Sequence, residues 1–176
     1  VVVHKKEYDV DIVTDLPKLQ NFLDDIGKVK AENKECLLLA LELRHFNIIN
    51  TLYGYDFGNK TLYEISKMLL DIMGEYGSVY RLDGAAFGII FKTANLEYLK
   101  ENYSIIKREL SKFTLEGFLL NIELCGGALY TQNYEVSHLM VYSYLISALE
   151  KAKDEEGTNF VVFDDASHEN NHKTLE

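Results

Sequence analysis

The sequence has little cysteine, little proline and few positive charges. Its two cysteines, Cys36 and Cys125, are too few for a disulfide framework, and both lie in apolar runs, which indicates buried, reduced thiols. One proline in 176 residues, with 47% hydrophobic and 26% charged residues, argues against a disordered chain. The net charge of −10 argues against a DNA- or RNA-binding protein, which needs clustered Lys and Arg, but it permits one small nucleotide in a local pocket.

Long apolar runs are also absent. No stretch reaches the roughly 18 apolar residues of a membrane span, and no signal peptide opens the chain. We therefore expect a cytoplasmic domain without membrane contact, although a parent protein could be membrane-anchored. The chain begins at Val1 without Met, which indicates a piece of a longer protein. We predict an extension or linker over residues 1–10, one domain over 11–166, and a polar tail over 167–176 that is disordered or foreign to the natural sequence.

Hydrophobic periodicity predicts alternating helices and strands. Apolar residues spaced by three and four predict helices over residues 17–33, 62–73, 96–113 and 136–153. We expect Pro17 to take the first helical position. Short apolar runs predict strands over 36–43, 121–130 and 160–163, the second with a Gly-Gly kink. The stretch 44–59 is polar and contains glycine around one apolar patch, and the pattern assigns no element to it.

The Asp83-Gly84 pair is the clearest local signal. Apolar runs over residues 78–82 and 85–91 flank it, and the pair favours the positive φ angles of a type I′ hairpin turn. A turn alone would explain both residues without any function. Strands interleaved with helices, together with one hairpin, predict an α/β fold in which helices pack on a mixed sheet.

Four stretches carry, in order, the motifs of one known family. D-x-L-T-G-L-P-N-R matches residues 11–19, D-h-F-K-x-I-N-D-x-Y-G-H-x-x-G-D matches 44–59, R-Y-G-G-D-E-F matches 81–87, and A-L-Y-x-A-K-x-x-G-R-N matches 148–159 with one extra residue before the glycine. The chain therefore resembles the GGDEF family of bacterial diguanylate cyclase domains. The resemblance implies a nucleotide-cyclase-like fold with a central mixed sheet of five strands and helices on both faces.

The resemblance also implies a reaction whose metal ligands this sequence lacks. Family members join two GTP molecules, held on two facing domains, into cyclic di-GMP with the help of metal ions. The metal-binding aspartate of the family falls on Arg44, and the two acidic signature residues fall on Ala85 and Ala86. Neither residue type supplies a side-chain oxygen to Mg²⁺. We therefore expect no metal, no cofactor and no catalysis, since Glu42 nearby has no evident partner ligands.

The resemblance also implies that this sequence lacks the inhibitory site of the family. An R-x-x-D motif before the signature is matched by Glu75-Tyr76-Gly77-Ser78. Glu75 would repel the phosphates of cyclic di-GMP where the family has an arginine to hold them. Ser78 replaces the aspartate. We expect no product binding there.

The sequence keeps only part of the nucleotide pocket that the resemblance implies. The resemblance places the guanine-contacting asparagine on Asn50, the guanine-binding aspartate on Asn59 and the phosphate-contacting lysine on Lys153. The Asn59 amide offers one acceptor and donors where a carboxylate offers two acceptors, so it matches guanine poorly. The vestigial pocket would comprise Arg44, Phe46, Asn47, Asn50, Asn59, Asp83, Gly84 and Lys153.

Each of these residues also has a structural interpretation. Arg44 could hold a phosphate or form an ion pair with Glu42 or Asp83. Asn50 could cap the helix that follows it, and Lys153 suits the negative end of a helix dipole.

We therefore predict a catalytically inactive GGDEF domain that serves as a regulatory or interaction module in cyclic di-GMP signalling. By family analogy it would adjoin a phosphodiesterase or sensor domain in a larger chain, and it could form a homodimer. The alternative is a non-catalytic sensor of GTP or another nucleotide. An active cyclase is the third possibility.

Overall fold

The centre of the molecule is a mixed sheet of five strands in the order β2-β3-β1-β6-β7. The computed structural model describes residues 9–154 and 159–164, so most of the predicted extension and the whole tail 167–176 lie outside it. The strands are β1 (Leu37–Leu43), β2 (Gly77–Arg81), β3 (Ala86–Phe91), β6 (Leu124–Tyr130) and β7 (Phe160–Val162). β7 runs parallel to β6 and the other neighbours are antiparallel, which confirms the predicted mixed α/β sheet.

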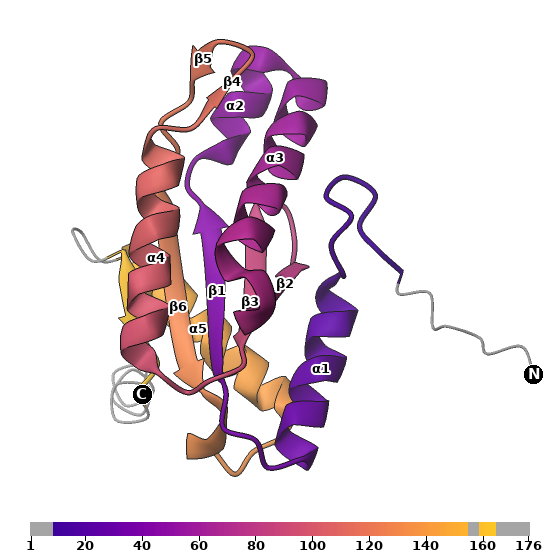
Figure 1. Ribbon diagram of the computed structural model, residues 1–176, viewed down its shortest axis with the longest axis vertical. Coiled ribbons are helices and arrows are strands. Elements are labelled where there is room, and N and C mark those ends of the chain that lie inside the picture. The colour runs from indigo at the N-terminus through magenta and orange to yellow at the C-terminus, as the bar shows by residue number, and fades with distance from the viewer. Residues whose placement is uncertain (1–8, 155–158, 165–176) are drawn as a thin grey trace, which may run out of the picture.

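Helices cover both faces of this sheet (Figure 1). They are α1 (Leu19–Ala31), α3 (Tyr55–Met73), α4 (Leu96–Ser111) and α5 (His138–Asp154). Single 3₁₀ turns follow α3 at Gly74–Tyr76 and β6 at Thr131–Asn133. Because side chains alternate along a strand, β1 serves two cores. Leu37 and Leu39 join the core under α3 and α4, whereas Leu38 and Ala40 join the core under α1 and α5.

Both cysteines are buried and form no disulfide, as predicted. Pro17, in contrast, does not begin α1. Lys18 is the N-cap residue, and Pro17 forms an isolated bridge with Val10 that closes an N-terminal turn. The proline therefore belongs to the turn, where the missing N–H costs nothing.

The sequence pattern assigned no element to residues 44–59. This stretch contains α2 (Phe46–Tyr53) and the start of α3, separated by Gly54 at φ 89°. α2 buries Phe46 and Ile49 and leaves Ile48 and Leu52 exposed, and its eight residues are too few for a helical period to be recognised in the sequence. The small sheet of β4 (Thr114–Leu115) and β5 (Phe118–Leu119) was also missed, because strands of two residues have no readable period.

Two details of the glycine predictions were wrong as well. Of the Asp83-Gly84 pair only Gly84 has a positive φ, at 52°, so the hairpin turn is not type I′. The Ala86 amide closes the turn on the Asp83 carbonyl at 2.8 Å. The expected Gly-Gly kink is absent, since β6 pairs with β1 residue by residue along its whole length.

Candidate functional site

The tip of the signature hairpin lies beside the end of β1. The β1–β3 register pairs Glu42 with Ala86, and the Leu43 amide donates to the Ala85 carbonyl at 3.0 Å. A cavity of about 350 Å³ opens here. Its lining residues come from β1, the hairpin and α5: Glu42, Leu82, Asp83, Gly84, Ala85, Ala86, Tyr142, Ile146, Leu149 and Glu150. The two signature alanines therefore face the same cavity as a carboxylate.

Lys153 supplies the positive charge at this place. Its ammonium lies 2.7 Å from a Glu42 carboxylate oxygen and 2.9 Å from a Glu150 carboxylate oxygen. The Lys153 and Glu42 side chains are 23% and 30% exposed, so this ion pair is largely shielded from water. Burial opposes the charge on Lys153, but the hydrogen bonds to Glu42 and Glu150 outweigh it and raise the pKa of the ammonium. Lys153 thus stays charged and holds Glu42.

These residues do not fit a divalent cation. The carboxylates that line the cavity are Glu42, Asp83 and Glu150, and the Lys153 ammonium already lies at hydrogen-bond distance from an oxygen of Glu42 and an oxygen of Glu150. Ala85 and Ala86 contribute no side-chain ligand. Among the described residues, no group of three or more His, Cys, Asp and Glu side chains is placed to hold a metal ion.

The cavity is also unfavourable for phosphate groups. Glu42, Asp83 and Glu150 line it, and Lys153 balances only part of their charge. Burial and the nearby Asp83 carboxylate raise the pKa of Tyr142, so the phenol remains neutral. A triphosphate entering the cavity would meet net negative charge in a partly desolvated place.

Arg44 does not line this cavity. Its guanidinium donates to the Lys153 backbone carbonyl at 3.1 Å, and its side chain borders a separate cavity of about 190 Å³. Glu42, which could have been its partner, pairs with Lys153 instead. Burial raises the pKa of the neighbouring Cys125 thiol, and Arg44 partly opposes this rise. Arg44 therefore fastens the end of α5 to the end of β1.

The predicted guanine-binding residues lie on neighbouring helices. Asn50 is in the interior of α2, and its carbonyl accepts from the Gly54 amide at 2.9 Å. The N-cap of α3 is Gly54, so the capping role considered for Asn50 was wrong. The Asn50 side-chain oxygen packs so closely on Gly58 of α3 that a methyl group there would overlap it. Asn59, one residue further along α3, is exposed.

Phe46 and Asn47 sit at the start of α2 and do different things. Phe46 is buried in the core under α3. Asn47 is exposed, and its carbonyl accepts from the Thr51 hydroxyl at 2.9 Å. Neither lines the cavity at the signature hairpin, so the structure brings together only part of the predicted pocket.

The stretch matched to the inhibitory site lies at the far end of β2. Glu75 is in the 3₁₀ turn after α3 and is exposed, and Ser78 is exposed on β2, an edge strand. The stretch presents a carboxylate and a hydroxyl on this edge, and neither offers the positive fork that binds phosphate well.

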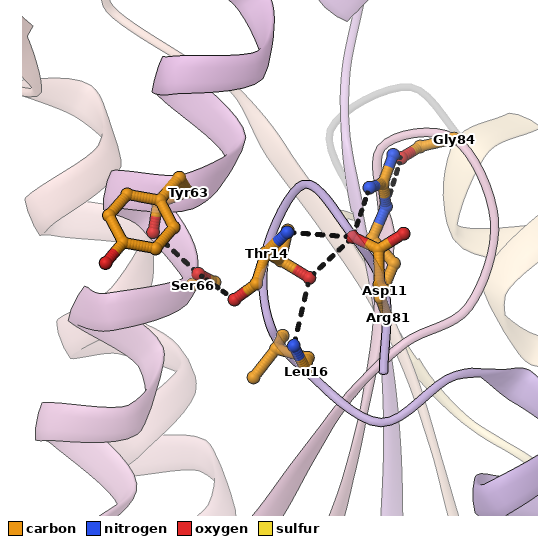
Figure 2. Close-up of polar contacts among 7 residues, drawn as sticks. All are labelled: Asp11, Thr14, Leu16, Tyr63, Ser66, Arg81 and Gly84. Carbon is orange, nitrogen blue, oxygen red and sulfur yellow. Dashed lines mark hydrogen bonds and ion pairs between the residues drawn. The ribbon is translucent and has the colours of Figure 1, made fainter. Parts of the chain in front are cut away.

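A polar network ties the N-terminal turn to the signature hairpin (Figure 2). One Asp11 carboxylate oxygen accepts from the Thr14 amide at 2.9 Å, the Thr14 hydroxyl at 2.8 Å and the Arg81 guanidinium at 2.9 Å. Arg81 also donates to the Gly84 carbonyl at 2.8 Å. The Ser66 hydroxyl, from α3, lies 3.3 Å from the Thr14 carbonyl. We call the Asp11–Thr14–Arg81–Gly84 set the hairpin clamp.

We expect Arg81→Ala to lower the free energy of unfolding by about 1–3 kcal/mol at neutral pH, because Asp11 and the Gly84 carbonyl lose a donor. The two ion-paired side chains are only 14% and 17% exposed, so water replaces the lost contacts poorly. Urea unfolding measures the change. Arg108→Ala is the matched control: its ion pair with Glu109 is exposed, and we expect a change within about 0.5 kcal/mol.

The clamp also predicts a pH dependence. Burial alone would raise the pKa of Asp11, but the hydrogen bonds from Thr14 and the Arg81 charge outweigh it and lower the pKa below the usual 3.8. A depressed pKa stabilises the fold above the unfolded value, and that stability is lost as pH falls through the folded value. The gap between wild type and Arg81→Ala should therefore narrow below about pH 4. A gap that is constant down to about pH 2 would contradict the ionic role of Asp11.

Sequence reasoning missed two ion pairs, the one between Glu42 and Lys153 and the one between Asp11 and Arg81. Glu42 was dismissed for lack of partner ligands, yet its partner is a cation, Lys153, 111 positions later in the chain. Lys153 and Glu150 stand three apart on α5, a spacing that does signal a helical ion pair. Asp11 and Arg81 each open a family motif, but nothing in either motif says that they meet.

A mixed sheet of five strands, with the signature hairpin and the end of α5 gathered at the end of its central strand, defines a mixed α/β domain. Residues 8–159 match the family described as diguanylate cyclase, GGDEF domain. This match covers most of the chain, so the chain belongs to the GGDEF family.

Known proteins of similar sequence and structure include the following. An uncharacterized membrane protein of Staphylococcus saprophyticus is 27% identical over 91% of this chain and 47% of its own length. The diguanylate cyclase DgcZ of Escherichia coli is 33% identical over 51% of this chain and 31% of its own. The solved diguanylate cyclase/phosphodiesterase of Caldicellulosiruptor saccharolyticus superimposes with a TM-score of 0.76 at 24% identity, covering 87% of this chain and 91% of that one. The chain spans less than half the length of the two curated relatives. None of its described helices is long and apolar enough to cross a membrane.

Proposed function

We propose that this domain is a catalytically inactive GGDEF module that regulates or contacts other domains in cyclic di-GMP signalling, within a longer cytoplasmic or membrane-anchored protein. The observation that carries the proposal is the Lys153 ammonium, which lies 2.7 Å from Glu42, a residue that lines the same cavity as the two signature alanines. A divalent metal ion would offer open coordination positions to phosphate oxygens, whereas the ammonium bound to Glu42 offers none.

The relatives support the setting of this module. DgcZ is a diguanylate cyclase, and the Caldicellulosiruptor protein combines cyclase and phosphodiesterase in its description. A further relative, the cyclase SiaD of Pseudomonas aeruginosa, has been solved with its activator SiaC. We therefore propose an adjoining phosphodiesterase or sensor domain, or a separate partner protein, as the recipient of the signal.

A nucleotide sensor is the second candidate. The observation that favours it is the placement of Asn50 and Asn59, the two residues matched to the base-binding positions, on the adjoining helices α2 and α3. The residues that would have to hold the phosphates argue against a nucleotide sensor. Arg44 and Lys153 both already have partners, and Glu42, Asp83 and Glu150 surround the nearby cavity.

A ligand panel separates the two candidates. With GTP, ATP and cyclic di-GMP at about 1 mM, the upper end of common KM values, we expect neither a thermal shift nor a calorimetric isotherm, with Mg²⁺ or with EDTA. The reason is that the cavity excludes phosphate by its charge and the inhibitory stretch presents Glu75. The arms of the panel are the wild type, Arg44→Ala, Asn59→Asp and Glu75→Ala.

Four results would contradict this expectation, each in its own way. Mg²⁺-dependent GTP binding by the wild type would restore the active-cyclase reading. Nucleotide binding in EDTA that Arg44→Ala abolishes would establish the sensor, and a gain in GTP preference in Asn59→Asp would show that this base pocket is used. A micromolar cyclic di-GMP isotherm that Glu75→Ala removes would establish an inhibitory site.

A further inference from the structure

A groove lies between α3 and α4, the two helices that cover one face of the sheet (Figure 1). We call it the α3–α4 groove, and its lining comes from residues 64–72 of α3 and residues 105–114 of α4 and the start of β4. Its volume is about 680 Å³, against about 350 Å³ for the cavity at the signature hairpin. The two share no lining residue, so the vestigial nucleotide pocket does not explain the groove.

Four apolar side chains line the α3–α4 groove. Met68 and Ile72 stand four apart on α3, Ile105 lies on α4, and Phe113 follows the end of α4. All four are half-buried, and Met68, Ile72 and Phe113 pack against the buried core. The groove therefore presents apolar area that is held in position by the core, and covering this area would remove it from water at a gain in free energy.

The two lysines of the groove are already paired along their own helix. The Lys67 ammonium lies 3.9 Å from the Glu64 carboxylate, three positions earlier on α3, and 5.4 Å from the centre of the Tyr63 ring. The Lys112 ammonium, at the C-cap of α4, lies 3.1 Å from the Glu109 carboxylate. In the part of the chain that the structure describes, no ion pair joins α3 to α4 across the groove. The apolar lining is therefore not bridged by charged side chains.

Asp71 is the charged residue of the groove that lacks a partner. It is exposed on α3, next to Ile72, and its carboxylate makes no hydrogen bond or ion pair with another described residue. Together with Glu64 and Glu109 it gives the lining three carboxylates against two ammonium groups. The uncompensated charge of the groove is therefore negative, as is the net charge of −10 of the whole chain.

The shape of the groove favours a helix as its occupant. The α3 residues that line it stand at positions 64, 67, 68, 71 and 72, the spacing of one helix face, and extend over about 12 Å. Side-chain rows on two adjoining helices leave a channel into which the ridge of a third helix can pack. Two to three turns of an amphipathic helix would fill such a channel with their apolar side chains.

Charge favours a basic helix. A Lys or Arg beside the apolar stripe of the partner can pair with Asp71, and the negative charge of the whole domain attracts a cationic partner from a distance. A second copy of this chain would bring the same excess of negative charge and would be repelled.

We propose that the α3–α4 groove is the docking site for a basic amphipathic helix of a partner protein. The apolar stripe of that helix packs on Met68, Ile72 and Ile105, and one of its cations pairs with Asp71. The inference rests on the interaction role proposed above, for which it names the kind of partner, and it does not depend on the loss of catalysis.

Methyl NMR of the chain labelled at methionine tests the proposal, because the sequence has only three methionines. Met68 lines the groove, Met73 is fully buried, and Met140 is exposed at the start of α5. The probe is an acetylated peptide of Leu, Lys and Ala with its leucines on one helical face, about 18 residues long so that it can form a helix. The same peptide with Glu in place of Lys is its control. Up to about 1 mM, we expect the basic peptide to shift the Met68 resonance and not that of Met140, and the acidic peptide to shift neither.

Substitutions separate the charge from the apolar contact. Asp71→Lys should raise the dissociation constant of the basic peptide about threefold or more, because an attraction becomes a repulsion. Glu101→Lys is the matched control, since Glu101 is exposed on α4 outside the groove and the change in net charge is the same. Ile105→Asn should raise the dissociation constant about fivefold or more through lost apolar burial. Its control is Ser104→Asn, at an exposed neighbour outside the lining.

Thermal melting shows that each variant is folded before it is compared. A Met68 resonance that the basic peptide leaves in place overturns the proposal. Equal binding of the acidic peptide, or equal weakening by Asp71→Lys and Glu101→Lys, also overturns it, because net charge alone would then attract the peptide. A Met68 shift that grows with protein concentration in the absence of peptide would assign the groove to a second copy and overturn the proposal as well. Synthesis of cyclic di-GMP by a domain that binds the peptide would contradict the proposed function alone and leave the docking site standing.

Discussion

Incubated with GTP and Mg²⁺ or Mn²⁺, the domain is expected to make no cyclic di-GMP. The reaction brings the 3′-hydroxyl of one GTP to the α-phosphate of another, and the charge that develops needs metal ions held by carboxylates. Ala85 and Ala86 supply none, and Lys153 already holds Glu42. Since enzymes accelerate reactions by at least about a million-fold, losing the metal site should put the rate below the background of a chromatographic assay with mass identification.

Two variants for this assay restore the acidic residues of the family pattern in steps. Ala85→Asp with Ala86→Glu returns the signature acids, and the addition of Arg44→Asp returns the remaining acidic position. We expect neither variant to recover full activity, because Lys153 still neutralises Glu42 and Asn59 still departs from the guanine-binding pattern. An active diguanylate cyclase run in parallel shows that product would be seen. Product from the unmutated domain above a blank without enzyme would refute the inactivity.

We expect Gly127→Ala to be the most destabilising of the conservative substitutions in the sheet. Gly127 lies in the middle of β6, and a Cβ there would sit 2.5 Å from the Leu149 amide nitrogen and 2.9 Å from the Ala148 carbonyl carbon. Both are backbone atoms of α5, so no side-chain rotation can relieve the overlap. Moving a packed helix should cost about 3 kcal/mol, the upper end of the usual overpacking range, measured as a lower midpoint in urea.

Gly27→Ala is the control, and we expect it to raise the stability of the fold instead of lowering it. Gly27 lies inside α1, and a Cβ there would meet nothing closer than a His138 ring carbon at 3.5 Å. Replacing a helix-interior glycine should stabilise the fold by about 0.5–1 kcal/mol. Equal effects of the two substitutions would show that close approach of α5 to β6 is not what Gly127 provides.

Gly127 also affects the charged residues at the signature hairpin. Lys153 and Glu150 sit on α5, and they reach Glu42 because α5 lies close against β6, next to β1. A shift of α5 would open the Glu42–Lys153 ion pair and the contact of Arg44 with the Lys153 carbonyl. The stability of the sheet and the charge pattern at the signature hairpin are therefore coupled through one glycine.

Sequence patterns were informative where one face of an element is buried. The stripe that predicted α4 and the apolar run that predicted β1 both correspond to real elements, since the core selects apolar residues at helical or strand spacing. α2 escaped because its eight residues are fewer than the window over which helical periodicity can be read. The Asp83-Gly84 pair marked the turn but not its type, because the turn closes between Asp83 and Ala86.

By itself the sequence determined the family, through four motifs in order, and placed Ala85 and Ala86 where the family pattern has two acidic residues. Only the tertiary structure decided which charged side chains meet at the signature hairpin. The Glu42–Lys153 pair and the Asp11–Arg81 clamp join residues far apart in the chain, and their contact depends on how α5 and the hairpin pack on the sheet. Local patterns report which face a residue takes, whereas the partner that it meets there is set by the packing of distant elements.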